Sequence, residues 1–427
     1  MNWLGVEMKF LLVNAYSSCN KGDFGIRIGL INSLRKEFGE FIQIGVLSST
    51  PEIDSICYER YNVNIIGWQI IKNFKSSRLE KIFRSLVISA KLFVLAIIYR
   101  ATGYYGRNAL LFSYIEADII ISPGGGFIND KSLFSIFLPN IYQIFIAIIL
   151  GKNYVIYAQS IGPFYNKASA FLTKTILNKA LMISVREEIS KEWLTRIGVN
   201  SAPIYITSDA AFLLEPASDD IIDNIFLNEG LPRENIVGVT PVNWSFPKSK
   251  NKRQKYDKYT EALAETIDYI ASKGFNILLI SQVTDIRSIG ENGDKITLND
   301  IRKRIKTKRK VYVLKGDYFP EELVGIYRRL ELLIGSRMHS NIFALSVGTP
   351  CIAIAYEHKT EGIMRKFGLG GWVISIEDIK SIDVINKFDE FLMNKGELKM
   401  IINKELRTIK NESLQNALIL KKYMELI

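Results

Sequence analysis

The run Asp-Ile-Ile-Ile-Ser at residues 118–122 passes directly into Pro-Gly-Gly-Gly at residues 123–126. Three consecutive isoleucines predict a short strand that is buried on both faces, as in a parallel sheet covered by helices. The glycines that follow allow a sharp turn or a close approach of another group to the backbone. The same succession of apolar strand, loop and helix recurs on both sides of this run.

Apolar strands alternate with helix-length segments through the first half of the chain. The strands are predicted at residues 9–13, 41–46, 118–122, 153–158, 182–185 and 204–207, and the helices at 25–38, 133–150, 167–179 and 187–197. This alternation predicts a doubly wound α/β domain, in which helices cover both faces of a parallel sheet.

A second alternation follows a strandless interval with two prolines at residues 214–233. The strands are predicted at 236–241, 276–280, 311–314, 332–335 and 351–355, and the helices at 256–273, 301–308, 321–329, 338–347, 361–367 and after 379. We therefore expect one domain over residues 1–215, a linker over 216–232 and a second domain over 233–427, closed by the C-terminal helices. Two such domains are expected to face each other across a cleft, with ligands beyond the carboxyl ends of the strands.

The composition excludes several classes of protein. With 427 residues, 48% hydrophobic and 23% charged, the chain is too long for one typical domain and too apolar for a disordered one. Three cysteines without a close pair exclude a disulfide scaffold and a four-cysteine zinc site. They fit a reducing, cytoplasmic compartment. Two histidines exclude a three-histidine metal site, and no metal is expected.

The positive net charge of +11 indicates an anionic partner or serves general solubility. The basic run 302–310 carries no nucleic-acid-binding motif, so we expect no nucleic-acid partner and favour an acidic membrane surface. Residues 1–4 show no secretory signal. The apolar stretches 85–99 and 133–150 are expected to be helices of a soluble fold. Peripheral contact of the first with the inner face of the plasma membrane stays open.

The first polar motif, Asn-Lys-Gly-Asp at residues 20–23, follows the first predicted strand. Asn20 and Gly22 suit an anion at the start of the next helix, because free backbone N–H groups point there. Asp23 is a candidate acid–base group. The alternative is a turn with a helix cap.

The second motif is the triple glycine of the opening run. Gly124, Gly125 and Gly126 are candidates for close contact with a substrate, and Asp130 is a candidate base. The run is neither a P-loop nor a dinucleotide fingerprint. A strained turn between strand and helix is the alternative interpretation.

Two further polar residues end predicted strands. Gln159, in Gln-Ser-Ile-Gly-Pro, is a neutral hydrogen-bonding group at a sheet edge. Arg186, in Val-Arg-Glu-Glu, ends an otherwise apolar strand, where a guanidinium can bind a carboxylate or a phosphate with two hydrogen bonds. The alternative for Arg186 is a structural pair with Asp209.

The most informative motif is Ser336-Arg337-Met338-His339, which joins a predicted strand to a helix. An arginine and a histidine at a helix N-terminus suit a phosphate and a proton transfer. The alternative is a histidine with a structural role. Lys359 lies in the next strand–helix loop, beside His358, and is a further candidate for substrate binding.

The ordered series of these motifs resembles the polysaccharide pyruvyltransferase family. The series reads Asn-x-Gly-Asp, Gly-Gly-Gly, Gln-Ser-Ile-Gly-Pro, Val-Arg-Glu-Glu, Ser-Asp and Ser-Arg-Met-His, then Gly-Thr-Pro-Cys-Ile-Ala-Ile-Ala-Tyr and Lys-Phe-Gly-Leu. The match runs from about residue 13 to 369. The family often has Arg-Asp where this chain has Arg186-Glu187, and Asp-Pro where it has Asp209-Ala210.

The resemblance implies two Rossmann-like doubly wound domains in a GT-B-like arrangement. It implies phosphoenolpyruvate as co-substrate, with no other cofactor, and a sugar acceptor on a cell-surface glycan precursor, expected to be lipid-linked. The product would be a pyruvate ketal. By this resemblance Arg337, His339 and Arg186 meet phosphoenolpyruvate, and we expect the donor in the second domain and the acceptor in the first.

Two other functions remain open from the sequence. One is a GT-B glycosyltransferase that uses a nucleotide sugar, since the architecture is the same. The other is a non-catalytic subunit of a glycan assembly complex. The released product, inorganic phosphate or a nucleotide diphosphate, distinguishes the first from the proposed activity.

Overall fold

The computed structural model describes residues 8–68, 78–247, 249–284 and 293–426, with backbone alone for 78–85. Residues 1–4, where we expect no secretory signal, lie outside the described residues. The contacts divide the chain into two compact units. Unit 1 comprises the chain up to Ser18, Ile26–Ala210 and the chain from Glu412, and unit 2 comprises Cys19–Gly25 and Ala211–Asn411.

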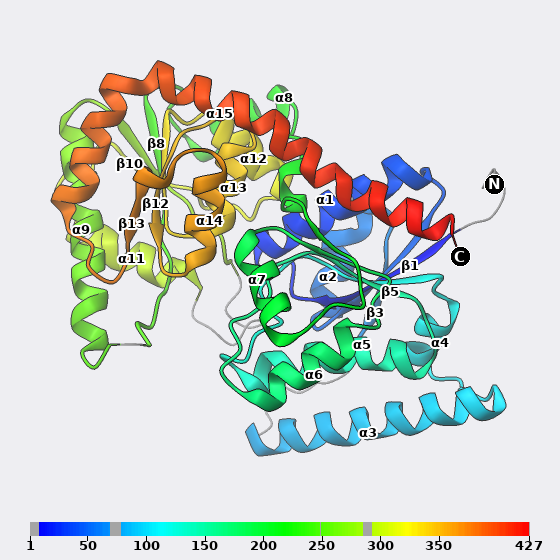
Figure 1. Cartoon of the computed structure of the whole chain (residues 1–427). Coiled ribbons are helices and arrows are strands. Elements are labelled where there is room, and N and C mark those ends of the chain that lie inside the picture. Colours follow the sequence, from blue (N-terminus) through cyan, green and yellow to red (C-terminus); the bar gives the residue numbers. More distant parts are fainter. Residues whose placement is uncertain (1–7, 69–77, 248, 285–292, 427) are drawn as a thin grey trace. The chain divides into compact units, whose positions relative to one another are not determined.

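Unit 1 is built on a parallel seven-stranded sheet with the order β3-β2-β1-β4-β5-β6-β7 (Figure 1). The strands are β1 (Lys9–Ala15), β2 (Gln43–Ser48), β3 (Asn64–Gly67), β4 (Ile119–Ser122), β5 (Tyr154–Gln159), β6 (Met182–Val185) and β7 (Ile204–Ile206). The three isoleucines of β4 are fully buried, as the opening run predicts, because β4 pairs with a strand on each side.

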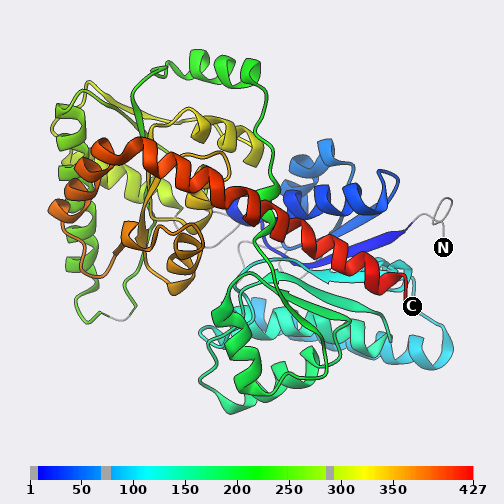
Figure 2. The same cartoon turned by 45° about the horizontal axis from the view of Figure 1, so that its top comes forward.

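Helices cover both faces of this sheet. They are α1 (Lys21–Phe38), α2 (Pro51–Tyr58), α3 (Arg78–Thr102), α4 (Ala109–Glu116), α5 (Leu138–Ile149), α6 (Lys167–Leu177) and α7 (Glu188–Ile197). Figures 1 and 2 place α1 on the face opposite α5 and α6. On the second face α5 packs against α3 and α6, and its buried isoleucines belong to the main apolar cluster.

Unit 2 repeats the plan with a parallel six-stranded sheet of order β10-β9-β8-β11-β12-β13. Its strands are β8 (Ile236–Thr240), β9 (Asn276–Leu279), β10 (Val311–Val313), β11 (Leu332–Gly335), β12 (Cys351–Ala355) and β13 (Val373–Ser375). Its helices are α8 (Asp219–Glu229), α9 (Lys252–Ser272), α11 (Asp294–Arg304), α12 (Pro320–Arg328), α13 (Met338–Leu345), α14 (His358–Lys366) and most of α15 (Ser381–Met424).

The interval predicted as a linker, 216–232, contains a helix of unit 2. The two prolines that suggested a linker flank α8, and Ile222, Ile225 and Phe226 bury its apolar face. The end of α15 belongs to unit 1, where Asn416 Nδ2 donates to the Ser208 carbonyl at 3.2 Å. The end of the chain was assigned to the second domain because a helix pattern carries no information about which sheet the helix covers.

One predicted helix differs in extent, and two strands are additional to those predicted. The basic helix expected at 301–308 is α11, which begins seven residues earlier, at Asp294. The edge strands β3 and β13 were not predicted, because both are short and only half-buried. Within the described residues, no helix is both long and apolar enough to traverse a bilayer.

Candidate active site

The corner between β11 and α13 places the arginine and the histidine of the most informative motif together. β11 is wholly buried and ends at Gly335. Arg337 follows in extended conformation as the N-cap of α13, and His339 is the second residue of that helix. Free backbone N–H groups and the positive end of the helix dipole favour an anion at this corner.

A buried carboxylate holds the Arg337 guanidinium. Arg337 Nη2 donates to Asp294 Oδ1 at 2.7 Å, and Nε lies 3.2 Å from both carboxylate oxygens. Asp294 is fully buried, whereas 20% of the Arg337 side chain is exposed. The ion pair therefore fixes the direction of a side chain that stays partly exposed.

Asp294 also organises the loop after β9. Its carboxylate accepts hydrogen bonds from the backbone N–H groups of Gln282 at 3.3 Å, Val283 at 3.1 Å and Asn243 at 3.4 Å. Asp294 is not among the residues predicted from the sequence. The signal available was an aspartate directly after Gly293, where an acidic residue commonly opens a helix.

The structure brings the Asn-Lys-Gly-Asp motif to this same corner in unit 2. Asn20 pairs in antiparallel fashion with Val283, and Lys21 N donates to the Gln282 carbonyl at 3.1 Å. Residues 20–23 therefore run beside the loop that carries the Asp294 hydrogen bonds. The sequence had placed them in the first domain, because chain order alone does not show that a segment joins the other unit.

Gly22 is required by the close approach of the His339 ring. A Cβ atom on Gly22 would lie 2.5 Å from His339 Nδ1 and 2.6 Å from its Cγ. Such distances are far below van der Waals contact, so only glycine leaves room for the imidazole. The group that approaches Gly22 is thus a side chain of the chain itself, and the anion expected beside Gly22 stays a prediction.

Asn20 caps α1 and holds Asp23. Asn20 Oδ1 accepts from Gly22 N at 3.2 Å, and Asn20 Nδ2 donates to Asp23 Oδ2 at 2.8 Å. This is the helix cap that the sequence left open as the alternative. The hydrogen bond from Asn20 also fixes the half-buried carboxylate of Asp23, the residue that follows Gly22 in the chain.

Gln282 contributes a buried amide whose side-chain atoms are unsatisfied. Only 2% of the residue is exposed, and neither amide atom has a hydrogen-bond partner among the described residues. A buried polar group without a partner costs about 1–3 kcal/mol. A ligand or a water molecule that paired with this amide would recover that free energy.

Ser336 and Lys359 make contacts that favour supporting roles. The Ser336 hydroxyl is buried and lies 2.7 Å from the Tyr259 hydroxyl. Burial raises the pKa of Tyr259 well above its ordinary value, so this phenol stays a neutral donor. Lys359 Nζ pairs with Glu357 at 2.7 Å at the start of α14, next to the exposed His358.

Arg186 lies in unit 1 and is buried, with 1% of its side chain exposed. Its Nε donates to Ser160 Oγ at 2.7 Å, Nη1 pairs with Asp209, and Nη2 donates to the Gly125 carbonyl at 3.2 Å. Every nitrogen of the guanidinium has a protein partner. This geometry favours the structural pair with Asp209 over contact with phosphoenolpyruvate.

The triple glycine packs against the end of β5. A Cβ on Gly124 would lie 3.0 Å from the Ala158 carbonyl, and the Gly125 carbonyl accepts from Ser160 N at 2.9 Å. The Gly126 carbonyl accepts from Asn129 Nδ2 at 2.7 Å. These contacts favour the alternative of a tight turn between strand and helix.

Asp130 and Gln159 complete the predicted residues of unit 1. Asp130 Oδ2 accepts from the backbone N–H groups of Tyr165 and Asn166, each at 2.6 Å, and so orders the start of α6. Gln159 is fully buried, and among the described residues neither of its amide atoms has a partner. Gln159 therefore keeps its unused hydrogen-bonding capacity, and Asp130 keeps part of its own, because its buried Oδ1 has no hydrogen-bond partner among the described residues.

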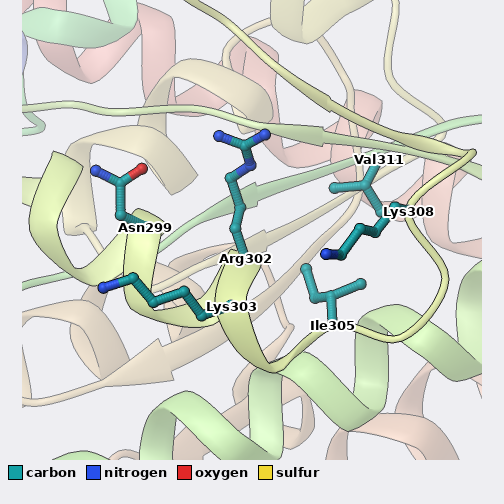
Figure 3. Close-up of a pocket in the computed structure, with 6 residues that line it drawn as sticks. All are labelled: Asn299, Arg302, Lys303, Ile305, Lys308 and Val311. Atoms are coloured by element: carbon teal, nitrogen blue, oxygen red, sulfur yellow. The ribbon is translucent and has the colours of Figure 1, made fainter.

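A surface pocket lies on another part of unit 2. It has a volume of about 400 Å³ and is lined by Asn299, Arg302, Lys303, Ile305, Lys308 and Val311 (Figure 3). These residues come from the end of α11, the following loop and β10, whereas Asp294 opens α11. None of the lining residues belongs to the predicted site.

The described residues contain no group of three or more His, Cys, Asp or Glu side chains placed to hold a metal ion. The absence of a metal and of a cofactor other than the co-substrate stays a prediction.

Structures of known proteins share the fold. UDP-GlcNAc 2-epimerase from Neisseria meningitidis, bound to UDP-GlcNAc, superposes with a TM-score of 0.63 at 13% identity, covering 98% of this chain and 100% of its own. Anabaena Alr3699/HepE in complex with UDP-glucose gives 0.61 at 13% identity, covering 99% and 100%. The predicted fold class, two Rossmann-like doubly wound domains of the GT-B type, is confirmed.

Sequence comparison defines the class of function. The amylovoran biosynthesis protein AmsJ of Erwinia amylovora is 24% identical over 405 residues, which cover 92% of this chain and 94% of that protein. Residues 20–358 match the polysaccharide pyruvyl transferase family, and this range includes every predicted site residue except Lys359. The predicted transferase class and polysaccharide acceptor are thereby supported, and the chain belongs to the polysaccharide pyruvyl transferase family.

Proposed function

We propose that this chain transfers a pyruvyl group from phosphoenolpyruvate to a sugar of a cell-surface polysaccharide precursor and forms a pyruvate ketal. The observation that carries the proposal is the corner where Arg337 and His339 share one helix N-terminus and Gly22 admits the imidazole. The match to the family supports the same activity.

The donor suits this corner chemically. Phosphoenolpyruvate carries a phosphate and a carboxylate, and both anions pair well with a guanidinium and with free backbone N–H groups. Asp294 balances the charge of Arg337 and holds its direction, so the partly exposed Arg337 side chain is preorganised. The amide of Gln282 is a further candidate donor to the carboxylate.

The reaction requires one proton on the methylene carbon of the donor and the loss of two hydroxyl protons from the sugar. Protonation converts the methylene to a methyl group and leaves an oxocarbenium-like carbon. One sugar hydroxyl adds to this carbon, the C–O bond to phosphate breaks, and the second hydroxyl adds. A protonated His339 supplies the first proton or stabilises the departing phosphate.

Asp23 is the carboxylate we propose for taking a hydroxyl proton from the acceptor. It lies on the same helical turn as Gly22, against which His339 packs. Asp130, the other candidate, already accepts two backbone hydrogen bonds in unit 1. We further propose that the acceptor is lipid-linked and that the protein works at an acidic membrane surface.

The direct test is incubation of the purified protein with phosphoenolpyruvate and candidate lipid-linked or nucleotide-linked sugars. We expect the sugar to gain the mass of one pyruvate less one water, with release of one equivalent of inorganic phosphate. Release of a nucleotide diphosphate from a nucleotide sugar would instead identify a glycosyltransferase.

The two histidines of the chain provide a matched pair of variants. We expect His339→Gln to lower kcat by about 10²–10⁴-fold, the usual contribution of a general acid. His358→Gln, at an exposed position, should keep normal activity. If His339→Gln and Arg337→Ala both leave glycan output unchanged in cells, the chain is a non-catalytic subunit and the proposal is wrong.

A further inference from the structure

Helix α3 of unit 1 carries an exposed apolar face that the proposed activity does not use. Leu86 is 63% exposed, Val94 51% and Ile97 47%. Val87, Phe93 and Ile98 are exposed as well. In Figure 1 this helix is the outermost layer of its side of unit 1, with α4 and α5 packed on its inner side.

The inner side of α3 is firmly seated, so its outward direction is defined. Leu92 and Ala96 are buried in the apolar cluster of unit 1. The Tyr142 hydroxyl donates to the Ser89 carbonyl at 2.5 Å, which ties this side of α3 to α5. The exposed residues therefore belong to a helix that is held in the fold by its opposite side.

Two cations border the exposed face. At about 100° per residue, Lys91 and Arg100 project about 180° apart around the helix axis. Both are exposed, and the apolar side chains lie in the sector between them. An apolar sector with a cation at each border is typical of a helix that lies in the plane of a membrane surface, since long cationic side chains reach up to the headgroups.

The positive charge of α3 and the segment after it favours an anionic lipid surface as the partner. From the start of α3, residues 78–115 contain six basic residues and one acidic residue, Glu80. The six are Arg78, Lys81, Arg84, Lys91, Arg100 and Arg107. A second copy docked through the same face would bring like charges together, which is unfavourable. An acidic lipid surface instead attracts each cation near it.

We propose that the outward face of α3, defined as Leu86, Val87, Phe93, Val94, Ile97 and Ile98, docks in plane on a bilayer that contains anionic lipids. The apolar side chains enter the boundary between headgroups and acyl chains, and Lys91 and Arg100 pair with lipid phosphates. The inference specifies the surface for the membrane contact in the proposed function, and it does not depend on phosphoenolpyruvate chemistry.

The test is flotation of the full-length protein with vesicles of phosphatidylcholine and phosphatidylglycerol, without donor or acceptor. We expect binding that weakens with salt and with loss of phosphatidylglycerol. The double variant Val94→Gln with Ile97→Gln should bind roughly tenfold more weakly or worse, because two half-exposed apolar side chains no longer enter the bilayer. Because no turnover is measured, failure here is distinguishable from failure of the proposed activity.

The matched control is Ile221→Gln with Leu227→Gln, the same chemical change at two exposed positions of α8. This control should bind vesicles as well as the unchanged protein. A second variant, Lys91→Glu, tests the charge with the apolar face intact and should also weaken binding. It keeps the test decisive if the double variant in α3 does not fold.

Three results would overturn the proposal. The unchanged protein does not float with anionic vesicles, or the α3 variants float as well as the unchanged protein, or the α3 variants only convert a dimer into a monomer. Loss of flotation confined to Arg302→Ser with Lys308→Ser would assign the membrane contact to the basic pocket of Figure 3 instead.

Discussion

The ion pair between Arg337 and Asp294 holds the Arg337 side chain in place and still leaves part of it exposed. A buried carboxylate fixes the direction of the side chain, and the exposed part is left for a ligand. A carboxylate without this partner would be an uncompensated buried charge, which is strongly unfavourable. The pair is therefore expected to matter for both stability and donor affinity.

For the substitution Asp294→Asn, we expect the KM for phosphoenolpyruvate to rise about tenfold, because the guanidinium loses its charged hydrogen-bond partner. The free energy of unfolding should fall by about 1–3 kcal/mol. Steady-state kinetics and urea unfolding measure the two effects. A loss of stability with an unchanged KM would show that Asp294 has no role in positioning Arg337 for the donor.

The contact between Gly22 and His339 gives a sharper prediction at the same scale. Gly22→Ala places a Cβ 2.5 Å from His339 Nδ1, so the imidazole must move. We expect loss of most activity with only about 1–3 kcal/mol of destabilisation. Gly371→Ala is the control, since a Cβ there meets no atom within 4 Å. Equal activity of the two variants would mean that the position of His339 is irrelevant.

At the scale of elements, Arg186 joins the carboxyl ends of several strands of unit 1. It links Ser160 after β5, Gly125 after β4 and Asp209 after β7. These loops could not be held together by apolar packing alone, because their backbone groups need hydrogen bonds. The buried Arg186 side chain therefore holds these three loops together at the carboxyl edge of the sheet.

We expect Arg186→Met to lower the free energy of unfolding by about 3–5 kcal/mol, because the buried Asp209 carboxylate loses the guanidinium that pairs with it. Chemical denaturation followed by circular dichroism measures this. Lys191→Met, an exposed change on α7, should have little effect. If Arg186→Met folds normally and only its KM for phosphoenolpyruvate rises, Arg186 is a donor ligand as the sequence suggested.

The buried tyrosines are a property of the whole molecule. Burial raises the pKa of Tyr58, Tyr157 and Tyr259 above the ordinary value of 10.0, and that of Tyr327 as well. In the unfolded chain these phenols ionise near the ordinary value, whereas in the fold they stay neutral. At alkaline pH the folded state therefore binds more protons than the unfolded chain does. The stability that the neutral phenols contribute is fully present below about pH 10 and is lost at higher pH.

We expect the free energy of unfolding to decline steadily as the pH rises above about 10, since only the unfolded chain then loses these protons. Urea unfolding at pH 8 and at several values above pH 10 measures the slope. Spectrophotometric titration should show a fraction of tyrosines that ionise only on unfolding. A flat stability between pH 8 and 11.5 would contradict this assignment.

The sequence by itself determined the fold class and the family. Fully apolar strands such as β4 are visible because a strand buried on both faces must be apolar along its length. The corner of Arg337 and His339 is visible for a related reason, since both residues lie within one local turn from strand to helix. The local sequence pattern is sufficient to predict a feature whose residues lie close together in the chain.

Only the tertiary structure decided which distant segments meet. It brought residues 20–23 to the His339 ring, paired Arg337 with Asp294, and enclosed Arg186 among protein partners. Each of these contacts joins residues that lie at least 23 positions apart in the chain, and neither residue type nor periodicity encodes the partner. The final turns of α15 joined unit 1 for the same reason: an amphipathic helix specifies that one face is buried, but not against which sheet.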